Sequence, residues 1–166
     1  RSIPAAGRKG GLGLVRPPRA MWLLWLSPIV GVLLWLWGRM LIGLVPATAE
    51  APIETLVAWP SGQLAVSLAG VLVPVAEELF FRGFVYGTLE RRFGRLAAFV
   101  VTVLLFTLAH LPQVWGAWGG LTAILVTGIV LTALRAWTGC TVAPAVAHVT
   151  HNGAISVFAA VLRAGG

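Results

Sequence analysis

The sequence contains no aspartate, a single lysine and a single cysteine. All five acidic residues are glutamates, namely Glu50, Glu54, Glu77, Glu78 and Glu90. Charged residues make up only 10% of the 166 positions and hydrophobic residues 58%, whereas soluble domains average about 25% charged and about 45–50% apolar residues. Cys140, the lone cysteine, has no partner for an internal disulfide. The composition excludes an ordinary soluble domain, a disordered chain and a disulfide-stapled scaffold.

The net charge is +7, but the placement of the basic residues argues against nucleic-acid binding, because no basic stripe follows a polar face. They cluster beside apolar blocks, first as Arg1, Arg8, Lys9, Arg16 and Arg19, and later as Arg91, Arg92 and Arg95. Such clusters are typical of the cytoplasmic flanks of transmembrane helices. We therefore expect no nucleic-acid partner and an integral membrane protein with a cytoplasmic N-terminus. Eleven arginines against one lysine favour a GC-rich bacterial genome, and hence a bacterial plasma membrane.

The apolar pattern predicts an all-α, polytopic membrane bundle with about five transmembrane helices. The apolar blocks fall at 21–45, 61–89, 96–111, 116–135 and 141–162, with a charged inner loop at 90–95. We divide the chain into a basic cytoplasmic arm (1–20), a first helix with an outer loop (21–60) and a core (61–162). A signal peptide is the alternative for the first block, because Ala47-Thr48-Ala49 resembles a cleavage site. Signal peptides have apolar regions of only about 7–15 residues, so we favour a retained helix.

Six ionisable side chains lie inside these apolar blocks, namely Glu77, Glu78, Arg82, His110, His148 and His151. A charge at the bilayer centre costs about 2.5–3.5 kcal/mol, so the group needs partners or a function. Glu78 and Arg82 are four residues apart and share a helix face, so they can form an ion pair. A purely structural clamp is one interpretation of this pair. Glu77 points about 100° away around the helix and is left over. It is a competent general base when a partner keeps it ionised, whereas His151 fits no pairing and is expected to be structural or to face solvent.

Two further pairs stand at helical spacing, Phe106 with His110 and His148 with Asn152. Counting the helical rise from the inner helix ends places Glu77 and His110 about 20 Å and about 21 Å into the membrane. His148 lies at about 11 Å and Asn152 at about 17 Å by the same count. These depths favour a shared intramembrane site.

An acid, two histidines and an amide indicate water activation combined with oxyanion stabilisation. Intramembrane aspartyl proteolysis needs two aspartates, and the chain has none. The His-Glu-x-x-His motif of zinc proteases is absent. Ser67 and Ser156 do not lie in a Gly-x-Ser-x-Gly context. Of these hydrolytic mechanisms, only one in which a glutamate acts together with histidines remains.

Three motifs follow one another along these helices: E-E-x-x-x-R at 77–82, F-x-x-x-H at 106–110 and H-x-x-x-N at 148–152. Together they resemble the CPBP family of CAAX proteases and bacteriocin-processing enzymes, also called the Abi family, over roughly residues 61–162. The resemblance implies a glutamate-dependent intramembrane endopeptidase, a kind of enzyme often labelled a metalloendopeptidase. Eukaryotic members remove the C-terminal tripeptide of prenylated CAAX proteins, and prokaryotic members are linked to peptide maturation and bacteriocin immunity.

The resemblance also implies roles for individual residues. Glu77 is expected to activate a water molecule as general base, and His110 to bind and orient that water. His148 and Asn152 are expected to form the oxyanion hole. The residues expected to support the site are Glu78, Arg82 and Phe106.

We expect no cofactor. Zinc is the open alternative, and its ligands would then be Glu77, His110 and His148. The expected partners are the lipid bilayer and a peptide or lipidated protein substrate. The alternative function is a non-catalytic membrane immunity or interaction protein that uses the same polar cluster structurally. A small-solute transporter is disfavoured, because the sequence shows no inverted repeat or paired broken helices.

Overall fold

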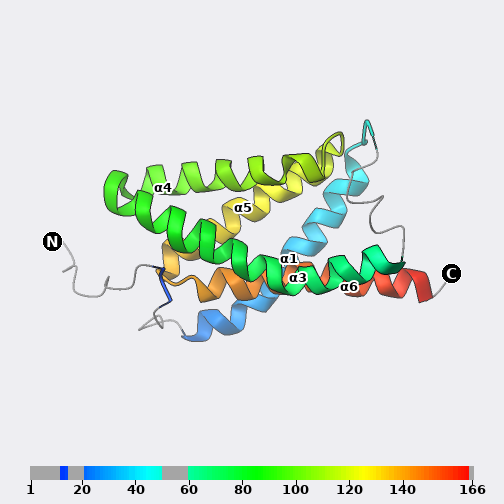
Figure 1. Cartoon of the computed structure of the whole chain (residues 1–166), viewed down its shortest axis with the longest axis horizontal. Helices are drawn as coiled ribbons and strands as arrows, with labels where there is room; N and C mark the ends of the chain where they lie inside the picture. The colour runs from blue at the N-terminus through cyan, green and yellow to red at the C-terminus, as the bar shows by residue number, and fades with distance from the viewer. Residues whose placement is uncertain (1–11, 15–20, 50–59, 165–166) are drawn as a thin grey trace.

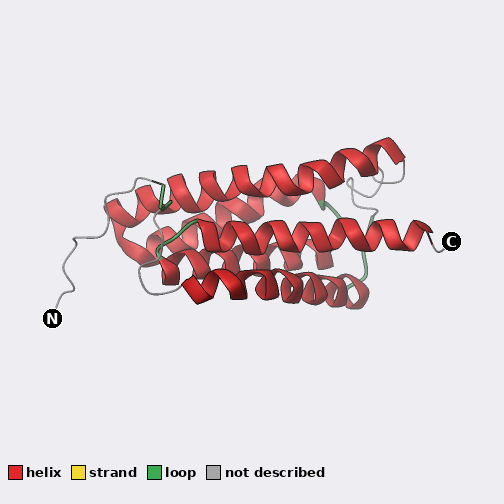
Figure 2. Ribbon diagram, turned by 90° about the horizontal axis from the view of Figure 1, so that it is seen from below, coloured by secondary structure: helices red, strands yellow, loops and turns green. Residues whose placement is uncertain are grey.

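The computed structural model describes residues 12–14, 21–49 and 60–164, and over these ranges it is a bundle of helices without a strand (Figure 1, Figure 2). Its elements are α1 (Met21–Leu44), α3 (Pro60–Glu78), the π-helix η1 (Leu79–Val85), α4 (Tyr86–His110), the short 3₁₀-helix η2 (Leu111–Gln113), α5 (Trp118–Thr138) and α6 (Val142–Ala164). The predicted all-α bundle is confirmed. Most of the predicted arm (1–20) and of the predicted outer loop (46–60) lies outside the described residues.

A tight hairpin closes one end of the bundle at Gly94, where φ is 83° and ψ is 173°. Helical structure runs without interruption from α3 through η1 into α4 up to this glycine, and Figure 1 shows the chain reversing there. The reversal falls within the predicted inner loop at 90–95, but the loop is shorter than predicted, because α4 is non-helical only at Gly94. Glycine adopts a positive φ at little cost, so a single residue makes the turn. The exposed side chains of Arg91, Arg92 and Arg95 lie around it.

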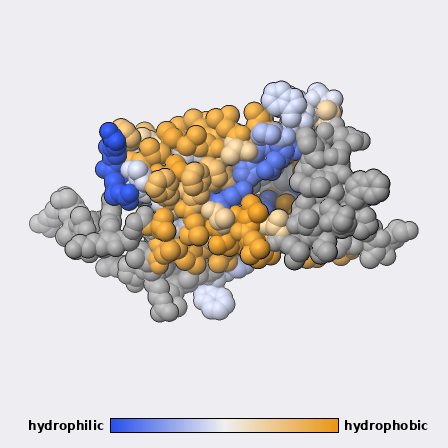
Figure 3. All heavy atoms as spheres, in the orientation of Figure 1, coloured by the Kyte–Doolittle hydropathy of each residue, from blue (hydrophilic) through white to orange (hydrophobic). Residues whose placement is uncertain are grey.

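Among the residues that the structure describes, three segments are long and apolar enough to cross a membrane, namely Trp25–Leu44, Ala69–Gln113 and Trp118–Thr138. The second is 45 residues long and contains the Gly94 turn, so it consists of two antiparallel helices. Large apolar side chains point outward along the bundle, with Leu72 exposed by 73% and Leu96 by 78%. The surface in Figure 3 is accordingly apolar over most of its described part. The chain is an integral membrane protein, and the total of about five spans stays a prediction.

The first helix, α1, packs against α5 and α6. Gly31 allows its closest approach, because a Cβ atom placed on this residue would lie 2.3 Å from the carbonyl oxygen of Ala147. Beside this contact, Leu34, Leu131 and Ala147 form a small buried apolar core. The helix predicted at 21–45 is therefore an integral part of the bundle and supports α6 from outside the three motifs.

Candidate active site

Glu77 and Glu78 lie at the end of α3, where the α-helix changes into the π-helix η1. Pro74, about one turn earlier, lacks the backbone N–H that an α-helix would use. Segments of π-helix are rare and occur frequently at functional sites. Because neighbouring helical residues point about 100° apart, the two adjacent carboxylates face different partners.

Glu78 is fully buried, and its Oε1 atom binds groups from two helices. Arg82 donates to it from Nη1 over 2.7 Å, and Nδ1 of His148 lies 2.8 Å away. Arg82 is also fully buried and donates from Nη2 to the carbonyl oxygen of Gly128 on α5 at 3.3 Å. The ion pair expected from the spacing of Glu78 and Arg82 is present. It links α3 and η1 to α5 and α6.

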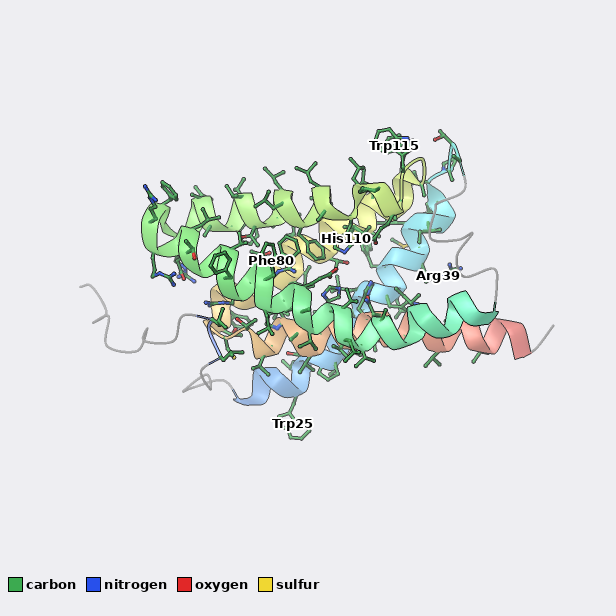
Figure 4. All side chains as sticks on the ribbon, viewed as in Figure 1. Trp25, Arg39, Phe80, His110 and Trp115 are labelled. Atoms are coloured by element: carbon green, nitrogen blue, oxygen red, sulfur yellow. The ribbon has the colours of Figure 1, made fainter. Side chains whose placement is uncertain are left out.

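Glu77 faces two histidines from different helices. Nε2 of His110 on α4 lies 3.5 Å from Oε1 of Glu77, and Nε2 of His148 on α6 lies 3.8 Å from Oε2. The Glu77 side chain is 21% exposed, whereas His148 is buried. Figure 4 shows His110 between the helices, and in the same view Figure 3 shows a hydrophilic band beside a hollow in the apolar surface there. The structure thus brings three of the four predicted catalytic residues together.

The hydrogen bond made by Nδ1 of each histidine determines whether Nε2 faces Glu77 as a donor or as an acceptor. Nδ1 of His110 lies 2.8 Å from the carbonyl oxygen of Phe106, and a carbonyl oxygen only accepts, so Nδ1 carries the proton. Nδ1 of His148 donates to the Glu78 carboxylate in the same way. In the singly protonated form of each ring, the lone pair of Nε2 therefore faces Glu77. The Glu77 carboxylate and the two Nε2 atoms are then all hydrogen-bond acceptors. Such a cluster suits a bound molecule that donates hydrogen bonds, as water does.

Phe106 is the ring around which this cluster is arranged. Its centroid lies 4.3 Å from that of His110 and 5.9 Å from that of His148. The guanidinium carbon of Arg82 lies 4.3 Å from the same centroid, within the range of a cation–π interaction. Gly128 makes room for the ring, because a Cβ atom there would lie 3.0 Å from Cδ1 of Phe106. Sequence reasoning missed Gly128, and no local signal distinguishes it among 20 glycines.

Asn152 lies one turn beyond His148 on α6 and packs toward α3. A Cβ atom placed on Gly70 would lie 3.7 Å from Cβ of Asn152. Asn152 is therefore on the turn adjoining the cluster rather than inside it. His151 lies where α6 meets α1, since a Cβ atom placed on Gly31 would be 3.0 Å from its backbone nitrogen. Its expected structural role fits this position and stays a prediction.

The contact between Glu77 and His148 differs from the depths counted along the sequence. Those depths placed His148 about 9 Å closer to the inner surface than Glu77. The count assumed that all inner helix ends lie at one level. In the structure α3, η1 and the beginning of α4 form one continuous helical segment that ends at Gly94. This segment extends well past the level at which α6 begins at Val142 (Figure 1). This offset brings His148 level with Glu77.

A family model described as type II CAAX prenyl endopeptidase Rce1-like matches residues 58–154. This range covers more than half of the chain and includes the predicted catalytic residues Glu77, His110, His148 and Asn152. The chain belongs to the Rce1-like family. The resemblance drawn from the three motifs is thereby confirmed. No curated protein and no solved structure matches the chain.

The Rce1-like match begins just before α3 and ends within α6, so it leaves out α1. The packing of Gly31 against Ala147 nevertheless places α1 against the helix that carries His148. The part of the chain outside the family match therefore contributes to the support of the candidate site.

Proposed function

We propose that this chain is an intramembrane endopeptidase of the CAAX-protease type, which hydrolyses a peptide bond in a membrane-associated or lipidated substrate. Membership of the Rce1-like family supports this class of activity. The structural observation that carries it is the convergence of Glu77 with the Nε2 atoms of His110 and His148 at 3.5 and 3.8 Å. Both distances are longer than the roughly 2.7–3.2 Å of a direct N–H···O hydrogen bond, and catalytic contacts are often long before substrate binds.

Glu77 and His110 activate the water in this proposal. A water molecule that donates one hydrogen bond to each of them keeps an oxygen lone pair free for attack. As this oxygen attacks the carbonyl carbon of the substrate, Glu77 takes up a proton and a tetrahedral oxyanion forms. When the C–N bond breaks, Glu77 returns that proton to the leaving amine. General base catalysis of this kind contributes about 10²–10⁴ in rate.

His148 and Asn152 stabilise the oxyanion in this proposal. The Asn152 amide is a donor without any change of protonation. His148 already donates its Nδ1 proton to Glu78, so donation from Nε2 requires a second proton on the ring. The carboxylates of Glu77 and Glu78 on either side of the ring balance the resulting positive charge.

We propose that hydrolysis proceeds without a metal ion. Oε1 of Glu78, the second carboxylate, already accepts from Arg82 and His148. Across residues 12–14, 21–49 and 60–164, no three His, Cys, Asp or Glu side chains are arranged to hold a metal ion. Were zinc to bind, its ligands would be Glu77 with the Nε2 atoms of His110 and His148, and it would polarise the bound water.

A second candidate function is a non-catalytic membrane immunity or interaction protein. The observation that favours it is the fully buried Glu78–Arg82 pair, which joins three helices and has the form of a structural clamp. In this case Glu77 belongs to the same clamp, and its replacement changes stability rather than chemistry.

The two functions are separated by cleavage assays on purified full chains in detergent. Wild type, Glu77→Gln and a matched Glu90→Gln variant are incubated with a mixed library of membrane and lipidated peptides, and products are identified by mass spectrometry. Glu90 is a suitable control because its partner is the exposed Arg95, 3.6 Å away at the Gly94 turn. We expect the same products from wild type and Glu90→Gln, and none from a folded Glu77→Gln.

Identical product profiles from wild type and a folded Glu77→Gln would contradict the peptidase proposal. A Glu77→Gln variant whose thermal unfolding falls well below that of Glu90→Gln would favour the clamp.

A further inference from the structure

A short piece of the N-terminal arm, Leu12–Leu14, lies against the bundle. Figure 1 shows it as a blue segment beside the beginning of α6. Thr141 binds this segment twice: its backbone N–H donates to the carbonyl oxygen of Gly13 at 2.9 Å, and its Oγ1 donates to that of Leu12 at 2.7 Å. Both acceptors are main-chain groups, as in the capture of extended peptides by other proteins. The contact therefore recognises the main chain of the segment before its side chains.

The residues that contact this segment leave room only for glycine at its central position. Gly13 is buried and has a φ of 66°, and a Cβ atom on it would lie 2.8 Å from Nη2 of Arg135 and 2.9 Å from Oγ1 of Thr141. On the other side, a Cβ atom on Gly83 would lie 3.1 Å from the carbonyl oxygen of Leu12. We call the seat formed by Thr141, Arg135 and Gly83 the arm cradle. It admits a segment of this backbone conformation only where the central residue is glycine.

The arm cradle is coupled to the candidate active site. Arg135 donates from Nε to the carbonyl oxygen of Arg82 at 2.9 Å, and the side chain of Arg82 binds Glu78. A cavity of about 350 Å³ lies between α3 and α6 on this side, with Leu14 at its edge. Its lining is apolar except for Glu78, Thr141 and Thr150. The arm thus places an apolar side chain at a cavity whose wall includes a residue of the active-site cluster.

The lining of this cavity is almost entirely apolar, so it suits a peptide that carries an apolar side chain.

We propose that the arm cradle and the adjoining cavity form a binding site for a peptide segment in which a glycine with positive φ stands between two apolar residues. The chain fills this site with its own Leu12–Leu14, which acts as a displaceable plug. When the plug leaves, a segment of another polypeptide with the same pattern takes its place and reaches the cavity beside Glu78. The proposal stands apart from the peptidase activity, because its test measures binding alone.

The first experiment measures the binding of a fluorescent peptide with the sequence of residues 9–16 to the full chain in detergent, by fluorescence polarisation. Gly13→Ala displaces the plug, because its methyl group meets Arg135 and Thr141. The matched control is Gly43→Ala, where an added Cβ meets nothing within 4 Å. We expect Gly13→Ala to bind the peptide about tenfold tighter than wild type or more, because an intramolecular competitor is removed. Gly43→Ala should bind as wild type does.

A peptide with alanine at the position of Gly13 controls for insertion into the micelle. It should bind poorly to every variant, because the arm cradle has no space for its methyl group. The proposal is overturned if the alanine peptide binds as well as the glycine peptide, or if Gly13→Ala and wild type bind the glycine peptide equally.

A disulfide staple tests the site without displacing the plug. A Cβ atom on Gly83 would lie 3.6 Å from Cβ of Leu12, which falls in the range of about 3.5–4.5 Å that disulfides require. We expect Leu12→Cys with Gly83→Cys to form this bond on oxidation, to lose peptide binding and to regain it on reduction. Each single cysteine variant serves as control, and native Cys140 is buried.

If Gly13→Ala fails to fold, the disulfide variant still tests the proposal. Equal peptide binding by the oxidised and reduced chains, or failure of the disulfide to form, overturns the proposal. Recovery of binding on reduction supports it, whether or not the chain hydrolyses any substrate.

Discussion

His148 donates its Nδ1 proton to Oε1 of Glu78 across 2.8 Å and so ties α6 to α3. The same oxygen accepts from Arg82 at 2.7 Å. Glu78 is therefore the acceptor shared by the buried ion pair and by His148, the proposed oxyanion-hole histidine. It fixes the ring of His148, and through that ring it fixes which nitrogen faces Glu77.

Removal of the charge of Glu78 should destabilise the chain more than the loss of the whole ion pair. Glu78→Gln leaves Arg82 as a buried, unpaired cation, which typically costs about 3–5 kcal/mol. Adding Arg82→Met removes that cation, so the double variant should regain part of the lost stability. Thermal unfolding in detergent measures both.

Glu90→Gln is the matched control for this experiment, because its ion pair with the exposed Arg95 is worth about 0–1 kcal/mol. A double variant that is less stable than Glu78→Gln alone would show that the Arg82 charge is stabilised by groups other than Glu78.

Asn152→Ala should lower kcat by about 10²–10³ and leave KM almost unchanged, as the loss of one oxyanion donor does in other hydrolases. The cause is that the amide acts on charge that develops only in the transition state. Gln113→Ala, which removes an exposed amide from η2, should retain wild-type kinetics. An unchanged kcat for Asn152→Ala would remove this residue from the proposed oxyanion hole.

Gly128→Ala should destabilise the chain by about 1–3 kcal/mol, as overpacking does in other cores, and lower cleavage. The added Cβ would lie 3.0 Å from Cδ1 of Phe106, so the ring that contacts His110 and His148 has to move. Gly153→Ala is the matched control on α6, because an added Cβ there meets nothing within 4 Å. Alanine in a helix is more favourable than glycine, so this control should be as stable as wild type or slightly more stable. Equal unfolding temperatures for the two variants would show that Phe106 tolerates displacement.

Metal analysis of active, purified protein should find substoichiometric zinc, and exhaustive treatment with a chelator should leave cleavage unchanged. This follows if Glu77 and His110 activate water directly. Stoichiometric zinc whose removal abolishes cleavage, and whose return restores it, would replace the metal-free mechanism. Glu77→Gln, measured alongside, should then show reduced zinc content as well.

Local spacing was enough to predict part of the site. Glu78 and Arg82 stand four residues apart on one helical segment, and their ion pair follows from helical geometry alone. The contact between Phe106 and His110 has the same origin. A shared site for Glu77 and His148 was expected from residue type and from the family resemblance. The counted depths nevertheless placed His148 about 9 Å shallower, because the offset between neighbouring helix ends is not a local property.

The sequence also did not allow us to predict which glycines permit close packing. Gly31, Gly128 and Gly13 each occupy a place where a Cβ atom would meet another helix or side chain. A chain with 20 glycines offers many such candidates. Only packing distinguishes the glycines that permit a close approach from those that face open space, such as Gly43.

The sequence by itself determined that this chain forms membrane helices, that their interior carries an acid, a paired acid and base, and two histidines, and that these motifs belong to one protease family. These properties depend on hydropathy and on spacing within a helix, which the order of residues sets directly. The tertiary structure decided which nitrogen of each histidine faces Glu77, and it placed Asn152 on the adjoining turn. It also seated Leu12–Leu14 on Thr141. These relations join different helices, and their distances depend on how the helices pack against one another.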